Sequence, residues 1–157
     1  MKKTFILLIF SFILVTDGIA QKAAKAVYGE LGGPGLASIN YDMRFQKKEN
    51  GFGFRAGIGG FAIDNQGLLL IPVGINYITS KDAKNYFEAG AGVSYIHAGK
   101  DFLFNDQPFT STFGFLTIGY RLAPAKGGFF FRASIDPVFG KGFFYPYYGG
   151  IAFGYKF

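Results

Sequence analysis

The chain has 157 residues, a formal net charge of +6, and a composition with 24 glycines, 21 phenylalanines and no cysteine. Without cysteine the protein has no disulfide, no thiolate metal site and no lipid attached through an N-terminal cysteine. The basic charge does not indicate a nucleic-acid-binding protein, because no run of Lys or Arg is longer than a pair such as Lys47 and Lys48.

Residues 1–20 have the layout of a secretory signal peptide. Two lysines precede an apolar run over 5–15, and small residues precede Gln21. The apolar run is too short to cross a bilayer as a helix, which takes about 20 residues. We therefore expect cleavage before Gln21, export through the Sec pathway and one mature domain over 21–157. An uncleaved N-terminal membrane anchor is the alternative.

The rest of the chain alternates with a period of two, and it contains neither a convincing helical period nor an apolar stretch long enough for a transmembrane helix. In the last segment the large apolar positions are Tyr145, Tyr147, Ile151, Phe153, Tyr155 and Phe157, and the positions between them include Pro146, Tyr148, Gly150, Ala152, Gly154 and Lys156. Similar patterns predict β-strands at 26–32, 36–46, 51–63, 67–79, 85–98, 109–122, 128–140 and 145–157.

The second face of these segments carries glycines and a sparse, balanced set of charges. In a soluble sandwich that face would point to water and carry abundant Lys, Glu and Thr. Here it suits the crowded interior of a small barrel, while the large apolar face suits contact with lipid. The segments are mostly about 10–14 residues long, as strands that cross a bilayer at a tilt should be. The predicted fold is therefore all-β, an antiparallel up-and-down transmembrane β-barrel.

A barrel whose chain enters and leaves on the same side has an even number of strands. Seven segments are clear, and 26–32, which reverses at the turn sequence Gly33-Pro34-Gly35, supplies the eighth. This segment is short for a spanning strand. If 26–45 is instead one long strand, the count is seven and the parity fails.

The two predicted ends of the barrel differ in their turns. The periplasmic turns contain Lys47, Lys48, Lys81, Lys84 and Lys126. The outer loops, over 33–35, 64–67, 99–108 and 140–144, are modest, which argues against an elaborate receptor or adhesin. Two aromatic rings are expected at headgroup level: Phe45, Phe52, Tyr77, Phe87, Tyr120, Phe129 and Tyr155 at the periplasmic ends, and Tyr95, Phe139, Tyr145 and Tyr147 at the outer ends.

Four stretches carry a family resemblance: Ala20-Gln21, the segment 30–35 followed by Ile39-Asn40-Tyr41, the segment 71–77, and Gly154-Tyr155-Lys156-Phe157. Together they make the mature chain resemble the small, porin-like outer-membrane barrels of Gram-negative bacteria, in particular an uncharacterised eight-stranded type from the Bacteroidota. The resemblance implies a location in the cell outer membrane, with outer-membrane lipids and lipopolysaccharide as partners. It also implies that the barrel-assembly machinery recognises the terminal aromatic residue, Phe157.

Nine charged residues fall on the predicted inward face: Glu30, Asp42, Arg44, Arg55, Glu88, Arg121, Arg132, Asp136 and Lys156. An eight-stranded barrel is just wide enough inside for side chains to fill, and an unpaired charge there would cost several kcal/mol. We expect these five bases and four acids to form an ion-pair network that fills the lumen. A narrow polar pore is the alternative.

His97, the only histidine, is the sole basis for an enzyme. Lipid A deacylases and acyltransferases occur among small outer-membrane barrels, and the next strand begins with Thr110, Ser111 and Thr112, which a histidine could activate. However, the deacylase pattern places His and Ser two residues apart, where this chain has Gly99, and Ser94 points to the other face. We therefore predict no enzyme and no catalytic residue.

No other motif indicates a ligand. The glycines over 57–60 and 90–92 lead into no helix, and the single histidine leaves no transition-metal shell, so we predict no cofactor-binding or metal-binding residue. The function expected is that of a monomeric outer-membrane barrel with a structural, adhesive or envelope-maintenance role. Besides the lipid A-modifying enzyme and the pore, a soluble barrel that holds an apolar ligand inside is an alternative.

Overall fold

In the computed structural model of the chain, the described residues are 23–63, 66–99 and 109–157. The predicted signal peptide over 1–20 lies outside them, as do residues 64–65 and 100–108 of two predicted loops. Within the described ranges, no helix has the length and apolar character needed to cross a membrane.

The described residues form ten strands and one short helical turn. These are β1 (Lys25–Gly32), η1 (Gly33–Gly35), β2 (Ala37–Arg44), β3 (Gly51–Ile63), β4 (Gln66–Thr79), β5 (Asn85–Ala98), β6 (Phe109–Leu122), β7 (Gly128–Ile135), β8 (Val138–Gly140), β9 (Phe143–Tyr145) and β10 (Gly149–Lys156).

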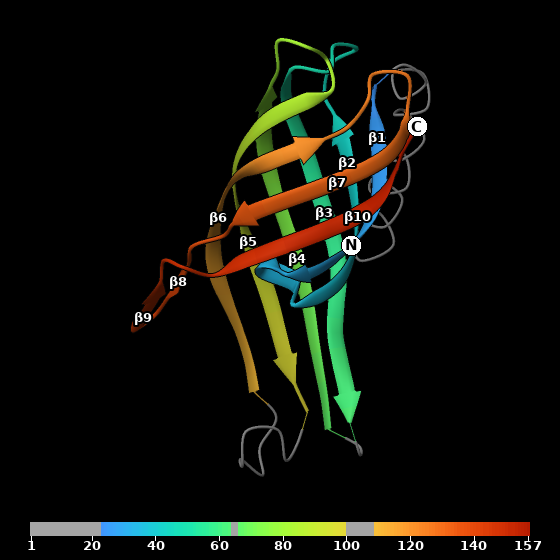
Figure 1. The fold of residues 1–157 in the computed structure, drawn as a ribbon. Coiled ribbons are helices and arrows are strands. Elements are labelled where there is room, and N and C mark those ends of the chain that lie inside the picture. The colour runs from blue at the N-terminus through green and yellow to red at the C-terminus, as the bar shows by residue number, and fades with distance from the viewer. Residues whose placement is uncertain (1–22, 64–65, 100–108) are drawn as a thin grey trace, which may run out of the picture.

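Eight of these strands close into a barrel. Neighbouring strands from β1 to β7 pair antiparallel in chain order, and β10 joins β7 to β1. The seam between β1 and β10 runs from Ala26 opposite Lys156 to Gly32 opposite Gly150 (Figure 1). The all-β, eight-stranded antiparallel barrel is confirmed. Segment 26–32 is a strand of its own, so the alternative of one long strand over 26–45 is wrong.

A tight turn separates β1 from β2. Gly32 and Gly33 have φ values of 75° and 65°, a region that glycine enters without steric cost. The η1 residues are buried, and the Ser94 hydroxyl donates a hydrogen bond of 2.8 Å to the Pro34 carbonyl oxygen. The turn therefore folds into the barrel mouth. We call this the η1 end, and the opposite end, where the backbones of Lys25 and Phe157 exchange hydrogen bonds, the terminal end.

The alternation along the strands sorts side chains between the interior and the outer surface. On β1, Tyr28 and Glu30 are buried, whereas Val27 and Leu31 are 42% and 63% exposed. The outward apolar residues also include the predicted aromatic positions at the terminal end, where Phe52 packs against Tyr77 with a ring-centroid distance of 5.0 Å. The predicted direction of the alternation, with the apolar face outward, is confirmed.

The prediction of two long strands over 128–140 and 145–157 is wrong. The first breaks after Ile135, because Pro137 has no N–H to donate to a ladder. Instead, the Asp136 N–H donates to the Tyr148 carbonyl oxygen at 2.6 Å, and the Leu116 N–H donates to the Pro137 carbonyl oxygen at 2.9 Å. The chain then forms β8 and β9, a small hairpin that projects from the barrel (Figure 1). The predicted turn over 140–144 is the turn of this hairpin.

The barrel wall is higher on one side. β3 to β6 have 13 or 14 residues each, whereas β1, β2, β7 and β10 have eight. At about 3.3 Å per residue, the longer strands exceed the shorter ones by roughly 20 Å. The excess extends beyond η1, past the turn that fills the mouth (Figure 1). The η1 end is therefore a tall half-wall facing a low rim.

Candidate functional site: the charged lumen

The nine charges that sequence parity places inside the barrel are all buried. None has a relative exposure above 4%, and Glu88, Arg132 and Asp136 are at 0%. Their strands contribute them at alternate positions, as on β2, where Asp42 and Arg44 both point inward. The predicted inward set is therefore confirmed residue by residue.

Glu30 is the centre of the first cluster, on the η1 side of the lumen. Its carboxylate pairs with Arg55 at 2.7 Å and also with Arg132. The Asn40 amide donates to it at 3.4 Å, and the Ser38 hydroxyl lies at the limit of a hydrogen bond, 3.5 Å. One buried carboxylate thus serves two arginines from opposite parts of the barrel wall, β3 and β7.

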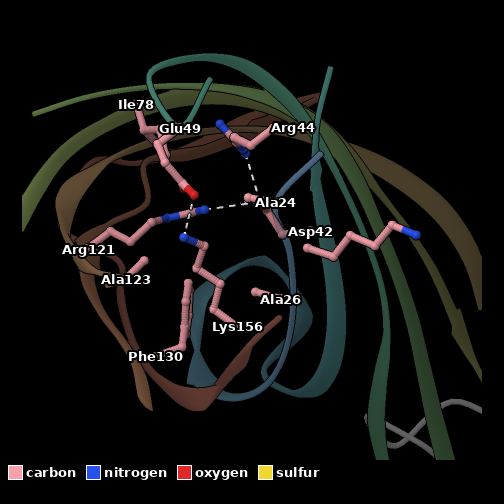
Figure 2. Close-up of a pocket in the computed structure, with 11 residues that line it drawn as sticks. Ala24, Ala26, Asp42, Arg44, Glu49, Ile78, Arg121, Ala123, Phe130 and Lys156 are labelled. Carbon is pink, nitrogen blue, oxygen red and sulfur yellow. Dashed lines mark hydrogen bonds and ion pairs between the residues drawn. The ribbon is translucent and has the colours of Figure 1, made fainter. Parts of the chain in front are cut away.

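Arg121 organises the second cluster, nearer the terminal end. Its guanidinium donates to both oxygens of Asp42, at 3.0 and 2.9 Å, and to both oxygens of Glu88, at 2.8 Å each. Arg44 pairs with Asp42 at 2.7 Å (Figure 2). The Asn76 amide bridges the same two carboxylates, with distances of 2.7 Å to Asp42 and 2.9 Å to Glu88. The forked geometry is the one in which arginine–carboxylate bonds are strongest.

Aromatic rings cover the flat faces of three of these arginines. The guanidinium carbons of Arg55, Arg121 and Arg132 lie 5.6, 5.2 and 4.9 Å from the ring centroids of Phe115, Phe130 and Tyr28. Such contacts favour a cation by about 0.5–2 kcal/mol. The three rings are buried beside the charges, and strand parity alone does not predict that they cover guanidinium groups.

Lys156 closes the terminal end of the lumen. Its ammonium group contacts Glu49 at 2.6 Å (Figure 2). It also donates to the carbonyl oxygens of Pro124 and Ala125, at 2.9 and 3.3 Å. Sequence parity could not find Glu49, because it lies in the β2–β3 turn, where no strand period applies. The space left among these side chains is about 10 Å³, room for about one water molecule.

Asp136 differs from the other inward acids. It accepts hydrogen bonds from the hydroxyls of Thr117 and Ser134, both at 2.7 Å, and within the described ranges no ion pair joins it to a base. The predicted pairing of the four inward acids therefore holds for Glu30, Asp42 and Glu88. Glu49, and not Asp136, is the acid that pairs with the fifth inward base, Lys156.

His97 lies outside the lumen, on the outward face of β5. Its Nδ1 is 3.0 Å from the Thr110 hydroxyl on β6. Ser111, by contrast, is the register partner of Ile96, and Thr112 is that of Tyr95. The structure therefore brings together His97 and Thr110, but not a histidine and a serine. Among the described residues, no group of three His, Cys, Asp or Glu has the arrangement of a metal site.

These features define the class of the fold, an outer-membrane-type β-barrel whose lumen is filled by paired charges. No protein-family model matches the sequence, and no curated protein matches it. The structure is similar to the N-terminal β-barrel domain of Pseudomonas aeruginosa OprF, with a TM-score of 0.65 and 13% sequence identity over 87% of this chain and 98% of that one. At that identity the similarity bears on the fold alone.

A second solved structure, that of the outer membrane enzyme PagL, matches with a TM-score of 0.38 and 18% identity over 83% of this chain and 96% of that one. This score is too low to support any statement about the chain.

Proposed function

We propose that the chain is an integral protein of the outer membrane of a Gram-negative bacterium of the Bacteroidota type, in which it acts as a closed, monomeric barrel with a structural, adhesive or envelope-maintenance role. The observation that carries this proposal is the belt of outward apolar side chains around a charged interior. Soluble monomers rarely expose contiguous apolar patches larger than a few hundred Å². Lipid is the solvent that suits such a belt.

The belt continues around the barrel. It includes Ile39 on β2, Ile58 on β3, Val93 on β5, Ile118 on β6 and Phe153 on β10, with exposed fractions from 50% to 65%. A soluble barrel that holds an apolar ligand around its axis would need these residues inside and the arginines outside. The observed burial is the reverse, which favours the membrane protein.

Cell fractionation tests the location. We expect the protein in the outer-membrane fraction, released by detergent but not by salt or alkaline carbonate, with a gel mobility that changes on heating. A protein that appears freely in the periplasmic extract would contradict the proposed location.

The proposal that the barrel is closed rests on the lumen contacts. Arg121 and Lys156 occupy its centre and terminal end, where ion pairs hold the buried charges and the space left among these side chains is about 10 Å³. In planar lipid bilayers we expect no stable single-channel current from the purified protein. A steady conductance in the same preparation would contradict the closed barrel and favour the narrow polar pore.

We also propose that the barrel is not an enzyme. His97 faces outward and contacts Thr110, and neither a serine nor a carboxylate completes a nucleophilic triad around it within the described ranges. Mass spectrometry of lipid A from cells with and without the protein tests this. We expect identical acylation patterns, and a change that a His97→Ala variant abolishes would establish catalysis.

The lipid and assembly partners follow from the same surface. Outer-membrane lipids and lipopolysaccharide are proposed to cover the belt, and the barrel-assembly machinery to recognise the end of β10. Phe157 is 58% exposed next to the seam. Deleting Phe157 is expected to lower the amount of folded protein in the outer membrane, measured by the heat-sensitive gel band. An unchanged amount of folded protein would contradict the proposed role of Phe157 in assembly.

A further inference from the structure

The polarity of the strands reverses along their length. On the terminal half of β6, the inward residues Thr117 and Arg121 are polar and the outward residue Ile118 is apolar. Toward the η1 end, Thr110 and Thr112 point outward, while Phe109 and Phe113 line the inner side. Beyond η1, β6 is therefore polar outside and largely apolar inside, and the inward residues Leu68 and Leu70 of β4 and Ile96 of β5 are apolar as well.

An apolar cavity lies against this inner side. It has a volume of about 330 Å³, at the small end of the range for ligand pockets, about 300–1,000 Å³. Its apolar lining includes Leu36, Leu70, Ile96, Phe113 and Val138, which come from the η1 turn, the tall half-wall and the projecting hairpin. The cavity is thus bounded by all three structures at the η1 end.

The η1 turn separates this cavity from the charged lumen. Pro34 lines the cavity, and its carbonyl oxygen is anchored to Ser94 across the barrel. Leu36 is held at a positive φ of 60°, an unfavourable conformation for leucine, and packs against the buried residues Leu68, Leu70 and Ala98. The turn therefore forms an apolar floor, so the cavity is a separate chamber and not the mouth of a pore.

The polar groups of the lining are few and specific. No charged residue is among the described residues that line the cavity, and its side-chain hydroxyls are those of Ser111, Tyr145 and Tyr148. The Tyr148 hydroxyl is buried and has no hydrogen-bond partner among the described residues. Buried hydroxyls in native proteins are nearly always satisfied, so the Tyr148 hydroxyl has a hydrogen bond to donate to a ligand in the cavity.

From these observations we propose that the cavity binds one aliphatic chain with an oxygen acceptor at its head, the chemistry of a fatty acyl group. A water-sized group takes about 10–15 Å³ of a volume measured in this way, so the cavity of about 330 Å³ has room for an acyl chain of more than ten carbon atoms. The absence of charge from the described lining disfavours sugars and phosphates, whose polar groups would be left unpaired there. The Tyr148 hydroxyl donates to the carboxylate or ester oxygen. This site is independent of the role proposed for the barrel.

The test uses the whole protein in lipid nanodiscs and photo-crosslinking. One sample receives a free long-chain fatty acid with a diazirine at the chain end, and a second contains a phospholipid with the same diazirine in an acyl chain. After irradiation, mass spectrometry maps the labelled residues. We expect labels on inward residues such as Leu70 and Phe113 in at least one sample, and the labelled sample identifies a free fatty acid or a membrane lipid as the source.

Two adjacent exposed residues of β6 provide matched variants. Ser111→Trp fills the cavity, whereas Thr112→Trp places the same side chain on the outward face. We expect Ser111→Trp to lower inward labelling at least fivefold and Thr112→Trp to leave it unchanged, with both retaining the heat-sensitive gel band of the folded barrel. Equal inward labelling of the two variants, or labels confined to outward residues in both samples, would overturn the proposal.

Tyr148→Phe tests the head contact without changing the packing. We expect about tenfold more free fatty acid to be needed for half-maximal inward labelling, because a hydrogen bond to a charged acceptor is lost. If the phospholipid is the source, the same variant lowers inward labelling by the phospholipid at a fixed lipid content. Unchanged labelling by the active source would overturn the role of Tyr148 as a donor.

Discussion

Replacing Arg121 with methionine removes the residue that holds the second cluster of the lumen together. Methionine keeps the unbranched, flexible stem of the side chain, but it is shorter, carries no charge and donates no hydrogen bond. Arg121 donates to four carboxylate oxygens, two on Asp42 and two on Glu88, and all three residues are at most 2% exposed. Solvent therefore does little to screen these charges, so their interactions carry nearly their full buried strength.

The expected loss of stability follows from the charges left behind. Asp42 keeps Arg44 at 2.7 Å, whereas Glu88 keeps the neutral Asn76 amide at 2.9 Å and, among the described bases, only Arg132 at 3.6 Å. Removing one partner of a buried ion pair costs about 3–5 kcal/mol, mainly because the other charge stays buried without compensation. We expect Arg121→Met to lower the free energy of unfolding by about that amount.

Urea unfolding in lipid vesicles, followed by circular dichroism and by the heat-sensitive gel band, measures this loss. The double variant Arg121→Met/Glu88→Gln removes the abandoned charge, and we expect it to recover about 1 kcal/mol or more. Lys126→Met removes a positive charge from an exposed turn and should stay within about 0.5 kcal/mol of the original protein. If Arg121→Met costs less than about 1 kcal/mol, or if the double variant is less stable than the single one, the ion-pair argument is wrong.

Three further changes test other parts of the structure. Ile118→Arg, in the middle of the outward belt, should cost about 2–4 kcal/mol in vesicles, and Thr110→Arg near the strand end about 0–1 kcal/mol; equal costs would contradict the lipid-facing belt. Gly32→Ala should destabilise the barrel by about 1–3 kcal/mol in the same unfolding assay, because φ is +75° there and the added methyl would overlap a carbonyl of β10; no loss would contradict the turn geometry. In the β4–β5 turn, a hydrogen bond from the Asn85 side chain holds the pKa of Asp82 well below its usual range. A carboxyl whose pKa is lowered by folding stabilises the folded turn at any pH above the pKa that it has in the unfolded chain, about 4. This stabilisation decreases as the pH falls below that value. We therefore expect hydrogen exchange at the Asn85 amide to accelerate on acidification below about pH 4, relative to the intrinsic rate, and Asp82→Asn to remove this dependence; a pH-independent relative rate would contradict it.

Strand parity predicted most of the lumen, because an inward position on a strand stays inward whatever the exact register. Glu30, Arg55 and Arg132 were placed inside from this rule alone, and all three meet in one cluster. The even number of strands also constrains the count: the segments from 36–46 through 145–157 are seven, so an eighth strand is required, and it pairs with both ends of the sheet. β1 is that strand, despite its length.

Strand parity does not predict which way side chains point in turns or at breaks in a strand, because the period of two does not apply there. Pro137 ends β7 because it lacks a donor, but a proline is also tolerated within β4, where Pro72 is paired with Ser94. The sequence does not distinguish these two cases. The same limit applies to Glu49 and to the inward fold of the η1 turn, because turn residues reach their partners through tertiary contacts rather than through a repeat.

The change of the inward face from polar to apolar beyond η1 is present in the sequence, but strand parity alone does not predict it. The inward positions of β6 change from Arg121 and Thr117 to Phe113 and Phe109, and those of β4 from Asn76 to Leu70 and Leu68. A period of two predicts one apolar outward side along the whole length of each strand. A strand that extends past the membrane has no reason to keep that side, since the solvent around it changes from lipid to water.

The seam between β1 and β10 joins the first and last strands of the domain, and no other pair of neighbours is so far apart in the sequence among the described residues. A chain that lacks β10, such as one whose synthesis is incomplete, exposes the edges of β1 and β7 at once, and unpaired edges recruit other chains. The barrel thus covers both exposed edges in a single step, when β10 pairs with β1 and β7. Until that step occurs, an incomplete chain has two unpaired sheet edges and depends on other proteins to cover them.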